Sequence, residues 1–201
     1  MSATKARLTA AERRAAVLEC ACGIFSKGSY RGTTTAEIAR RAGVTEPILY
    51  RHFRSKRDLY LACLESAWEE TKQMWEAAVT AEEDPALWMG AMGAAYLQVA
   101  KERHGVVANL WIQALTEASD DPEIRRHLKR HMREVHQFVV DVLRRSQEAG
   151  GIPNDRDPEA EAWIFISIGL LTAVSKRLGG MLEDDFVGIA TSRRRWMTEA
   201  D

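Results

Sequence analysis

The sequence contains little cysteine, and its few cysteines suggest neither a disulfide framework nor a metal site. Three occur among 201 residues. Cys20 and Cys22 are two positions apart on an expected helix, so their side chains point roughly 200° apart and do not grip one ion together. This usage favours a reducing compartment.

Long hydrophobic runs are also missing. The longest apolar stretch, Ala162 to Val174, contains Ser167 and Thr172 and is too short to cross a bilayer. The first residues are polar and charged and lack the apolar segment typical of a signal peptide. We therefore expect a cytoplasmic protein with no membrane partner.

The common sequence signatures of catalysis are absent. There is no nucleophile elbow, Walker loop, zinc-binding helix pair or glycine-rich dinucleotide turn. His127 and His131 have the spacing of two helical metal ligands, but Lys and Arg residues surround them and would repel a cation, so we expect both histidines on a solvated basic face. We expect no enzyme activity, no catalytic residue, no cofactor and no metal. An enzyme with an unrecognised site is the alternative, and turnover of a substrate would reveal it.

Charge is distributed unevenly along the chain. Hydrophobic residues make up 46% of the sequence, enough for a core, and the net charge is only −1. Residues 1–60 nevertheless contain 12 Lys and Arg against 5 Asp and Glu, whereas the remainder contains 16 against 24. A basic end on an acidic chain is typical of a protein that presents that end to phosphates.

Helix-start signals recur and strand alternation does not. Thr9 and Glu12 have capping-box spacing, and Asp-Pro pairs at 84–85, 121–122 and 157–158 place a capping Asp before a Pro in the first turn. The sequence predicts an all-α fold of about nine helices. The later helices are expected at about 56–80, 85–103, 106–118, 122–148, 158–178 and 185–199.

Residues 34–59 have the pattern of a helix-turn-helix. A helix-period segment ends at Gly43, which tolerates the left-handed conformation that closes a helix. Thr45 is a suitable N-cap and Pro47 suits the first turn of a second, short helix over about 46–53. In such motifs the second helix lies in the DNA major groove.

The same region resembles the DNA-binding head of the TetR-type transcriptional regulators. The match covers about a quarter of the chain and has no gap. The matching positions are Phe25, Gly28, Thr34 or Thr35, Ile38, Ala39, Ala42, Gly43, Val44, Leu49, Tyr50, His52, Phe53, Lys56 and Leu59. The resemblance implies a helix-turn-helix DNA-binding domain in residues 1–55 and a ligand-binding and dimerisation domain in residues 56–201.

The resemblance also implies roles at double-stranded operator DNA. Bases would be contacted from the second helix by Glu46, Pro47, Ile48 and Arg51, and Thr45 is also expected among the DNA-binding residues. Arg51 is the best candidate for a bidentate contact with guanine. Phosphates would be contacted by Thr35, Tyr50, His52 and Lys56. Ile38, Ala39, Leu49 and Phe53 are expected in the core of the three-helix head.

One position departs from the family pattern. Some members carry a long polar residue just after the threonine of the first helix, whereas this chain has Ala36. Base recognition is therefore expected to depend more on the second helix and on Lys5 and Arg7 in the N-terminal arm.

Aromatic and methionine side chains gather beyond the head. Flat rings and flexible thioethers suit a pocket for a small apolar or aromatic effector, which the resemblance places in the later helices. The candidate ligand residues are Trp75, Trp88, Met92, Tyr96, Asn109, Trp111 and Gln113. The alternative is that the large side chains are core and that the polar ones face solvent.

The helix expected at 158–178 is apolar around its whole circumference, so it needs cover on every side. The resemblance implies a homodimer in which this helix and the last one pair with their counterparts. A fully internal helix in a monomeric bundle is the alternative.

Together these features favour a homodimeric repressor that an effector releases from a palindromic operator. The second hypothesis is a helix-turn-helix regulator without a small-molecule effector, controlled by a protein partner or by abundance.

Overall fold

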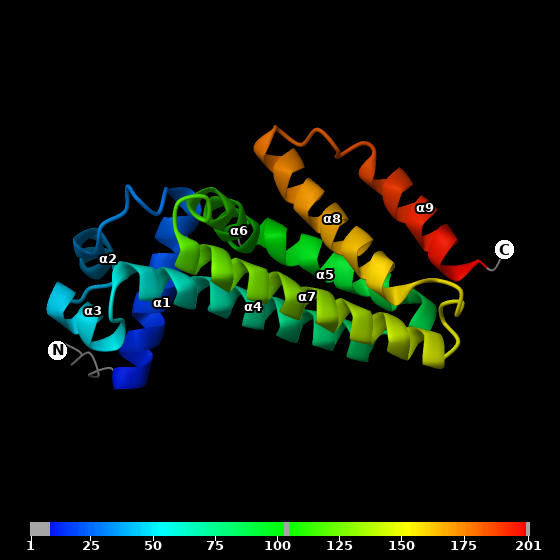
Figure 1. Ribbon diagram of the computed structural model, residues 1–201, viewed down its shortest axis with the longest axis horizontal. Coiled ribbons are helices and arrows are strands. Elements are labelled where there is room, and N and C mark those ends of the chain that lie inside the picture. The colour runs from blue at the N-terminus through cyan, green and yellow to red at the C-terminus, as the bar shows by residue number, and fades with distance from the viewer. Residues whose placement is uncertain (1–8, 103–104, 200–201) are drawn as a thin grey trace, which may run out of the picture. The chain divides into compact units, whose positions relative to one another are not determined.

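The computed structural model of the chain describes residues 9–102 and 105–199. Within these ranges the only regular elements are helices, so the predicted all-α fold is confirmed (Figure 1). The elements are α1 (Ala10–Lys27), α2 (Thr35–Arg41), α3 (Glu46–His52), α4 (Lys56–Ala81), η1 (Pro85–Leu87), α5 (Trp88–Glu102), α6 (Val106–Glu117), α7 (Pro122–Glu148), α8 (Pro158–Arg177) and α9 (Phe186–Thr198). Among the described helices, none is long and apolar enough to cross a membrane.

Side-chain caps produce most of the predicted helix starts. Thr9 and Glu12 form the two reciprocal hydrogen bonds of a capping box at the start of α1. Asp121 and Asp157 each accept a hydrogen bond from the backbone amide two residues later, at 2.9 and 3.0 Å, where α7 and α8 begin. These caps satisfy amides that have no partner inside the helix.

Two predicted helix starts are in place but differ in detail from what we expected. Asp84 accepts from the amide of Ala86 at 2.9 Å, but the turn that it caps is the short 3-10 helix η1, and α5 begins at Trp88. Tighter winding in the first turn accounts for the difference. Thr45 stands at the N-cap of α3 with extended backbone, but its hydroxyl makes no capping hydrogen bond.

The chain divides into two compact units. The first extends to Ala67 and also includes Asn109–Arg125; the second comprises Trp68–Ala108 and the chain from Arg126 onward. The α4, α6 and α7 helices therefore contribute residues to both units. The functional boundary predicted after residue 55 lies inside the first unit, and it stays a prediction about which residues bind DNA.

An aromatic group forms the centre of the first unit. The Tyr60 ring is fully buried, with its centroid 4.9 Å from that of Phe25 and 4.8 Å from that of Tyr30. The four side chains predicted as the core of the head are buried as expected: Ile38, Ala39, Leu49 and Phe53. Gly43, between α2 and α3, has φ +69°, so the predicted left-handed helix break is confirmed.

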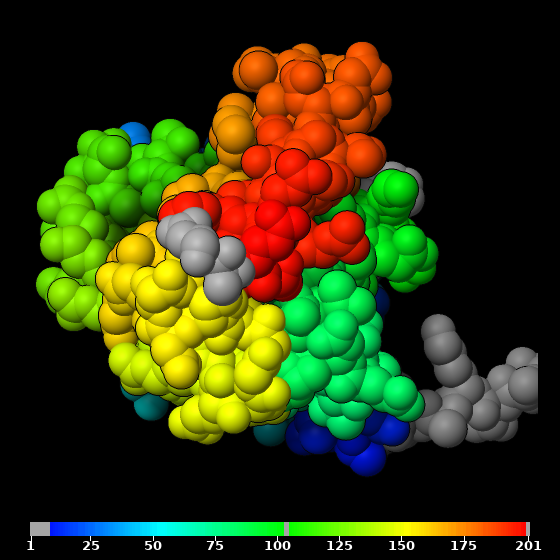
Figure 2. Space-filling model, turned by 90° about the vertical axis from the view of Figure 1, so that its right-hand side faces the viewer, coloured from blue at the N-terminus to red at the C-terminus, as the bar shows by residue number. Residues whose placement is uncertain are grey.

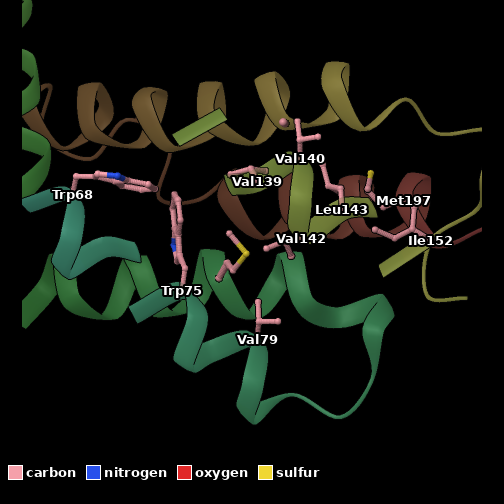
Figure 3. Packing of buried hydrophobic residues seen from close by; sticks show 11 residues of the cluster. Trp68, Trp75, Val79, Val139, Val140, Val142, Leu143, Ile152 and Met197 are labelled. Carbon is pink, nitrogen blue, oxygen red and sulfur yellow. The ribbon is translucent and has the colours of Figure 1, made fainter. Parts of the chain in front are cut away.

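A second hydrophobic cluster holds the second unit together (Figure 3). Trp68 and Trp75 meet edge to face at 6.0 Å between ring centroids, and Phe138 stacks on Trp75 at 5.9 Å. Met92 of α5 is fully buried in the same cluster. The cluster joins α4, α5, α7, α8 and α9, so it fixes the helices that surround the pockets described below.

The α8 helix has two apolar sides with different surroundings. Phe165 and Ile168 face the interior of the second unit, where α9 lies beside α8 (Figure 1). Trp163, Ile164, Leu171 and Val174 are between 38% and 46% exposed on the isolated chain. The chain itself therefore covers only one side of this helix, which we predicted to be apolar all round, and leaves the other side exposed.

Candidate nucleic-acid interface and ligand pockets

Three predicted DNA-contacting residues form one hydrogen-bonded group. The Thr35 hydroxyl, at the start of α2, donates to the Glu46 carboxylate of α3 at 2.6 Å. The Tyr50 hydroxyl lies 3.0 Å from the same threonine oxygen. Thr35 has one proton and gives it to Glu46, so Tyr50 is the donor in the second bond. This group ties the start of the first motif helix to two successive turns of the second.

The remaining predicted contacts follow the turns of α3. Thr45, Pro47 and Arg51 are exposed, and Ile48 and His52 are half-buried. Leu49, between them, is fully buried and anchors the helix. This arrangement leaves one continuous side of α3 open to solvent, with Arg51 as its charged member. The Lys5 and Arg7 predictions lie outside the described residues.

Lys56 has a structural role that the sequence did not indicate. Its Nζ donates to the backbone oxygens of Tyr30 at 2.9 Å and Thr33 at 3.0 Å, and it lies 4.4 Å from the centroid of the Tyr30 ring. The ammonium has three donors, so one remains for a phosphate. Lys56 therefore joins α4 to the α1–α2 loop in addition to its predicted contact.

An acidic corner at the junction of α6 and α7 belongs to the first unit, and sequence reasoning missed it. Arg31 pairs with Glu117 at 3.3 Å and with Asp120, while Arg57 pairs with Asp121 at 2.8 Å and with Glu123 at 2.7 Å. The partners are separated by 64 to 89 positions in the sequence. The charge count of residues 1–60 thus overstates how much positive charge is free for DNA.

The structure divides the seven predicted ligand residues between the two units. Asn109, Trp111 and Gln113 lie half-buried on α6 in the first unit. Trp75, Trp88, Met92 and Tyr96 come together in the second unit, with Trp75 and Tyr96 ring centroids 6.5 Å apart. Trp75 and Met92 are buried members of the hydrophobic cluster, so packing accounts for the Met92 side chain and for the Trp75 ring, although not for the Trp75 indole N–H.

Tyr96 also lines a small pocket of about 220 Å³, which we call the Tyr96 pocket. Thr71 and Met74 of α4 and Val106 and Val107 of α6 form other parts of its wall. Burial raises the pKa of the Tyr96 hydroxyl, because the phenolate would lose hydration there. Of the seven predicted ligand residues, Tyr96 is the one that lines this pocket.

A larger pocket of about 420 Å³ lies between α5, α8 and α9, and we call it the C-terminal pocket. Its walls are largely aliphatic or small. The side chains that line it include Leu87, Met89, Gly90, Gly93, Ala94 and Leu97 near α5, Phe165 and Ile168 on α8, and Phe186, Ile189, Ala190 and Met197 on α9. Sequence analysis did not identify this pocket, because its lining combines α5 with α8 and α9, which come much later in the chain.

One end of the C-terminal pocket is held by tight backbone packing. The Ser146 hydroxyl donates to the Pro85 oxygen at 2.7 Å. A Cβ on Gly151 would lie only 2.4 Å from the Pro85 carbonyl carbon, so this position admits glycine alone without a backbone shift. Figure 2 looks at this end, where α9 (red) borders the green part of the chain that includes η1. The wall at Ala86 and Leu87 is therefore firmly placed.

Polar groups occupy one side of the C-terminal pocket. Glu161, of which only 8% is exposed, pairs with Arg193 and accepts a hydrogen bond from the Trp196 indole at 3.0 Å. Burial lowers the pKa of Arg193, since the cation loses hydration. Arg194 lines both this pocket and a polar recess beside it.

His127 and His131 are buried instead of lying on the solvated face that we predicted. Their ring centroids are 6.1 Å apart, and His131 lies 5.6 Å from Trp68. Burial, with the nearby positive charge of His127 and Arg130, lowers the pKa of His131 to about 4. Within the described ranges, no group of three or more potential ligands could hold a metal ion.

The first unit defines a class of protein. Two helices meet at a glycine turn, and the second exposes Tyr50 and Arg51 on one side: this is a helix-turn-helix DNA-binding protein. The chain belongs to the tetR family of bacterial regulatory proteins, whose N-terminal region matches residues 17–63. Residues 85–168 match the C-terminal region of BetI-type transcriptional repressors.

Individual relatives agree with this assignment. The chain is 31% identical over 159 residues to the HTH-type transcriptional regulator TtgR of Pseudomonas putida, which is 76% of this chain and 74% of TtgR. It is 48% identical to the HTH-type transcriptional activator FasR of Mycolicibacterium smegmatis, but only over 59 residues, 29% of this chain and 27% of FasR. The chain is therefore a DNA-binding transcriptional regulator, and its relatives include an activator.

Solved structures share the fold. A TetR-family regulator from Cytophaga hutchinsonii superposes with a TM-score of 0.83 at 16% identity, covering 97% of this chain and 100% of the other. The structure of AibR in complex with isovaleryl coenzyme A and operator DNA gives a TM-score of 0.63 at 20% identity, covering 81% and 86%. At these identities the likeness concerns the fold alone.

Proposed function

We propose that this regulator is a homodimeric repressor that leaves a palindromic operator when its second unit binds a small apolar or aromatic molecule. Because its partner is DNA, we place it in the cytoplasm. The observation that carries the proposal is the C-terminal pocket, whose volume of about 420 Å³ lies within the usual range of ligand sites.

DNA would be bound by the open side of α3 and the start of α2. Tyr50, His52 and the remaining donor of Lys56 would position the head on phosphates, and Arg51 would read a base edge. Thr45, Pro47 and Ile48 would contact the groove floor. The bonds among Thr35, Glu46 and Tyr50 support this assignment, because they fix the angle between α2 and α3 before DNA arrives.

The dimer would form through α8 and α9. The side of α8 that carries Trp163, Leu171 and Val174 supports this proposal, since a row of exposed large apolar side chains marks an interaction surface. Two heads on one dimer would occupy successive major grooves about 34–36 Å apart, and the operator would share the two-fold symmetry.

Ligand control would act through α4, which contributes residues to both units. A ligand that displaces the helices of the second unit would shift α4 and hence the head, a hinge-type transition. The coupling free energy expected for such control is about 1–3 kcal/mol, or roughly 5- to 150-fold in DNA affinity. The AibR structure, which contains a ligand and operator DNA, supports a ligand-responsive function for a protein of this fold.

Reciprocal titration tests the proposal. The operator is first located by footprinting on the DNA beside the protein's own gene, and candidate compounds are then titrated with and without it, using tryptophan fluorescence. Linkage requires that the operator weaken ligand binding by the factor by which the ligand weakens operator binding. A compound that binds equally well in both titrations is not the effector. If occupied operator raises transcription of a reporter, the protein is an activator and the repressor assignment fails.

The second candidate function is a regulator without a small-molecule effector, controlled by a protein partner or by abundance. The buried positions of Trp75 and Met92 favour it over an aromatic effector among the tryptophans, because the Trp75 ring and the Met92 side chain are already packed against other residues. A broad compound screen with no ligand, combined with a protein partner that releases operator DNA, would establish it.

A further inference from the structure

Two glycines keep the C-terminal pocket open. Gly90 and Gly93 lie one turn apart on α5 and line the pocket. A Cβ on Gly90 would meet nothing within 4 Å, and a Cβ on Gly93 would meet only a Phe165 ring carbon at 4.0 Å. Neither glycine has positive φ, so the backbone does not need glycine at these positions. Glycine inside a helix is less stable than alanine, so the fold gives up stability here and gains space.

The walls around this space suit an alkyl chain better than a flat polar ring. Leu87, Met89, Leu97, Ile168 and Ile189 provide aliphatic surface, and Met side chains adapt to flexible ligands. The one buried carboxylate of the wall, Glu161, is paired with Arg193 and accepts a hydrogen bond from the Trp196 indole, so it is not available to a ligand. The tail end of the ligand would therefore be unbranched or lightly branched hydrocarbon.

Arg194 gives the site its head-group preference. It is exposed and lines both the C-terminal pocket and the polar recess next to it, together with Ala86, Leu87 and Thr191. Within the described ranges, no carboxylate lies in ion-pair distance of its guanidinium. The other charges of the recess are engaged: Arg195 pairs with Glu199 at 3.6 Å, and Asp84 caps the η1 turn.

We propose that the C-terminal pocket binds an aliphatic carboxylate, with its alkyl chain over Gly90 and Gly93 and its carboxylate on Arg194. A planar guanidinium is well matched to a carboxylate, with two parallel N–H···O bonds. This inference specifies the class of ligand for the C-terminal pocket. Binding of the carboxylate does not depend on the proposed function, whereas release of DNA by the carboxylate does.

Calorimetric titration of the full-length protein without DNA tests the binding step. Octanoate, decanoate and dodecanoate are used below their micellar concentrations, with 1-decanol and decyltrimethylammonium as neutral and cationic probes of similar length. We expect affinity to rise about fourfold per added methylene until the pocket is full. Decanoate should bind more tightly than decanol, and the cation least tightly. Absence of carboxylate binding at millimolar concentration, or equal binding of all three head groups, overturns the proposal.

Two pairs of variants locate the ligand. Arg194→Gln should weaken decanoate about tenfold or more and leave decanol unchanged. Lys101→Gln, at an exposed cation of α5 that lines neither the C-terminal pocket nor the recess, should leave both unchanged. Gly90→Leu should fill the space over α5 and abolish binding of decanoate and decanol, whereas Gly90→Ala should retain binding of the shorter octanoate. Full decanoate affinity in Arg194→Gln or in a folded Gly90→Leu protein overturns the assignment.

A parallel measurement separates this inference from the proposed function. Operator affinity is measured with and without saturating decanoate. If decanoate binds as predicted and operator affinity is unchanged, the site is correct and its role in releasing DNA is wrong. If decanoate does not bind but another compound releases the operator, the proposed function holds and this ligand class is wrong.

Discussion

The Thr35 hydroxyl donates a hydrogen bond to the Glu46 carboxylate across 2.6 Å, and so joins the two helices of the DNA-binding motif. Because its single proton is used there, its oxygen accepts from Tyr50. A phosphate that approached Tyr50 would compete with the Thr35 oxygen for the proton of the Tyr50 hydroxyl. The side of α3 that we propose to contact DNA is therefore organised before DNA arrives.

Removing this link should weaken binding to all DNA sequences. Thr35→Val should lower affinity roughly five- to tenfold for operator and scrambled duplex alike, since one organising hydrogen bond contributes about 1 kcal/mol. Fluorescence anisotropy on both duplexes measures it. A double-mutant cycle with Tyr50→Phe should show effects that are less than additive, because both changes break the same group. Fully additive effects would mean that the three side chains act separately.

Lys56→Ala should affect stability as well as DNA binding. It removes two charge-assisted hydrogen bonds to backbone oxygens, so we expect a loss of about 2 kcal/mol in the free energy of unfolding, measured in urea. The salt slope of DNA binding should fall by about one unit. Arg54→Ala removes an equal charge from an exposed side chain nearby and should leave stability unchanged. If the free energy of unfolding of Lys56→Ala equals that of the wild type, the hydrogen bonds of Lys56 do not stabilise the fold, and DNA contact is its remaining role.

Arg51→Ala should blur recognition at one base position. A bidentate arginine–guanine contact is worth about 1–3 kcal/mol of discrimination. Binding to a set of operators that each carry one substitution should show one position at which the variant no longer distinguishes bases. The salt slope should change by less than in Lys56→Ala. Retained discrimination at every position would exclude Arg51 as a base-reading residue.

A charge on the exposed side of α8 should dissociate the dimer without unfolding the chain. Leu171→Asp is suitable because Leu171 is 46% exposed on the isolated chain, whereas Ile168 lines the C-terminal pocket and its replacement would disturb both features. Light scattering should report half the wild-type mass. Leu115→Asp, at a leucine 48% exposed on α6, should leave the mass unchanged. A wild-type monomer at micromolar concentration would rule out the dimer.

Acidification should destabilise the fold through His131. Its pKa is about 4 in the folded chain against 6.5 for an ordinary histidine, so the unfolded chain binds more protons between these values. The contribution of neutral His131 to the free energy of unfolding is fully present above pH 6.5. It is lost as pH falls towards 4, by about 2 kcal/mol at pH 5. Urea unfolding of wild type and His131→Gln at pH 7.5 and 5 measures the difference. Parallel losses in both proteins would contradict the assignment.

Helix ends were predictable because they depend on neighbours in sequence. The capping box at Thr9, the turn at Gly43 and the caps at Asp121 and Asp157 all act over a few residues, and the structure has them where expected. Asp84 shows the limit, since the cap pattern does not specify whether the first turn winds as an α-helix or a 3-10 helix.

Tertiary partners were not predictable in the same way. The pairing of Arg31 and Arg57 with the α6–α7 corner joins residues more than 60 positions apart, and no local pattern specifies it. The tryptophans led us to expect a ligand site in the later helices, yet the C-terminal pocket depends on the absence of side chains at Gly90 and Gly93. Open space has no sequence signature without the fold around it.

The ion pairs of Arg31 and Arg57 have a consequence for how the head responds to salt. Lys and Arg side chains that neutralise phosphates drive binding by releasing condensed counterions from the DNA. These two arginines already carry counterions built into the protein, so engaging them with phosphate would first require breaking bonds to Glu117, Asp120, Asp121 and Glu123. Fewer positive charges of the head are therefore available to DNA phosphates than its formal charge implies. We expect this to lower its affinity for DNA of unrelated sequence.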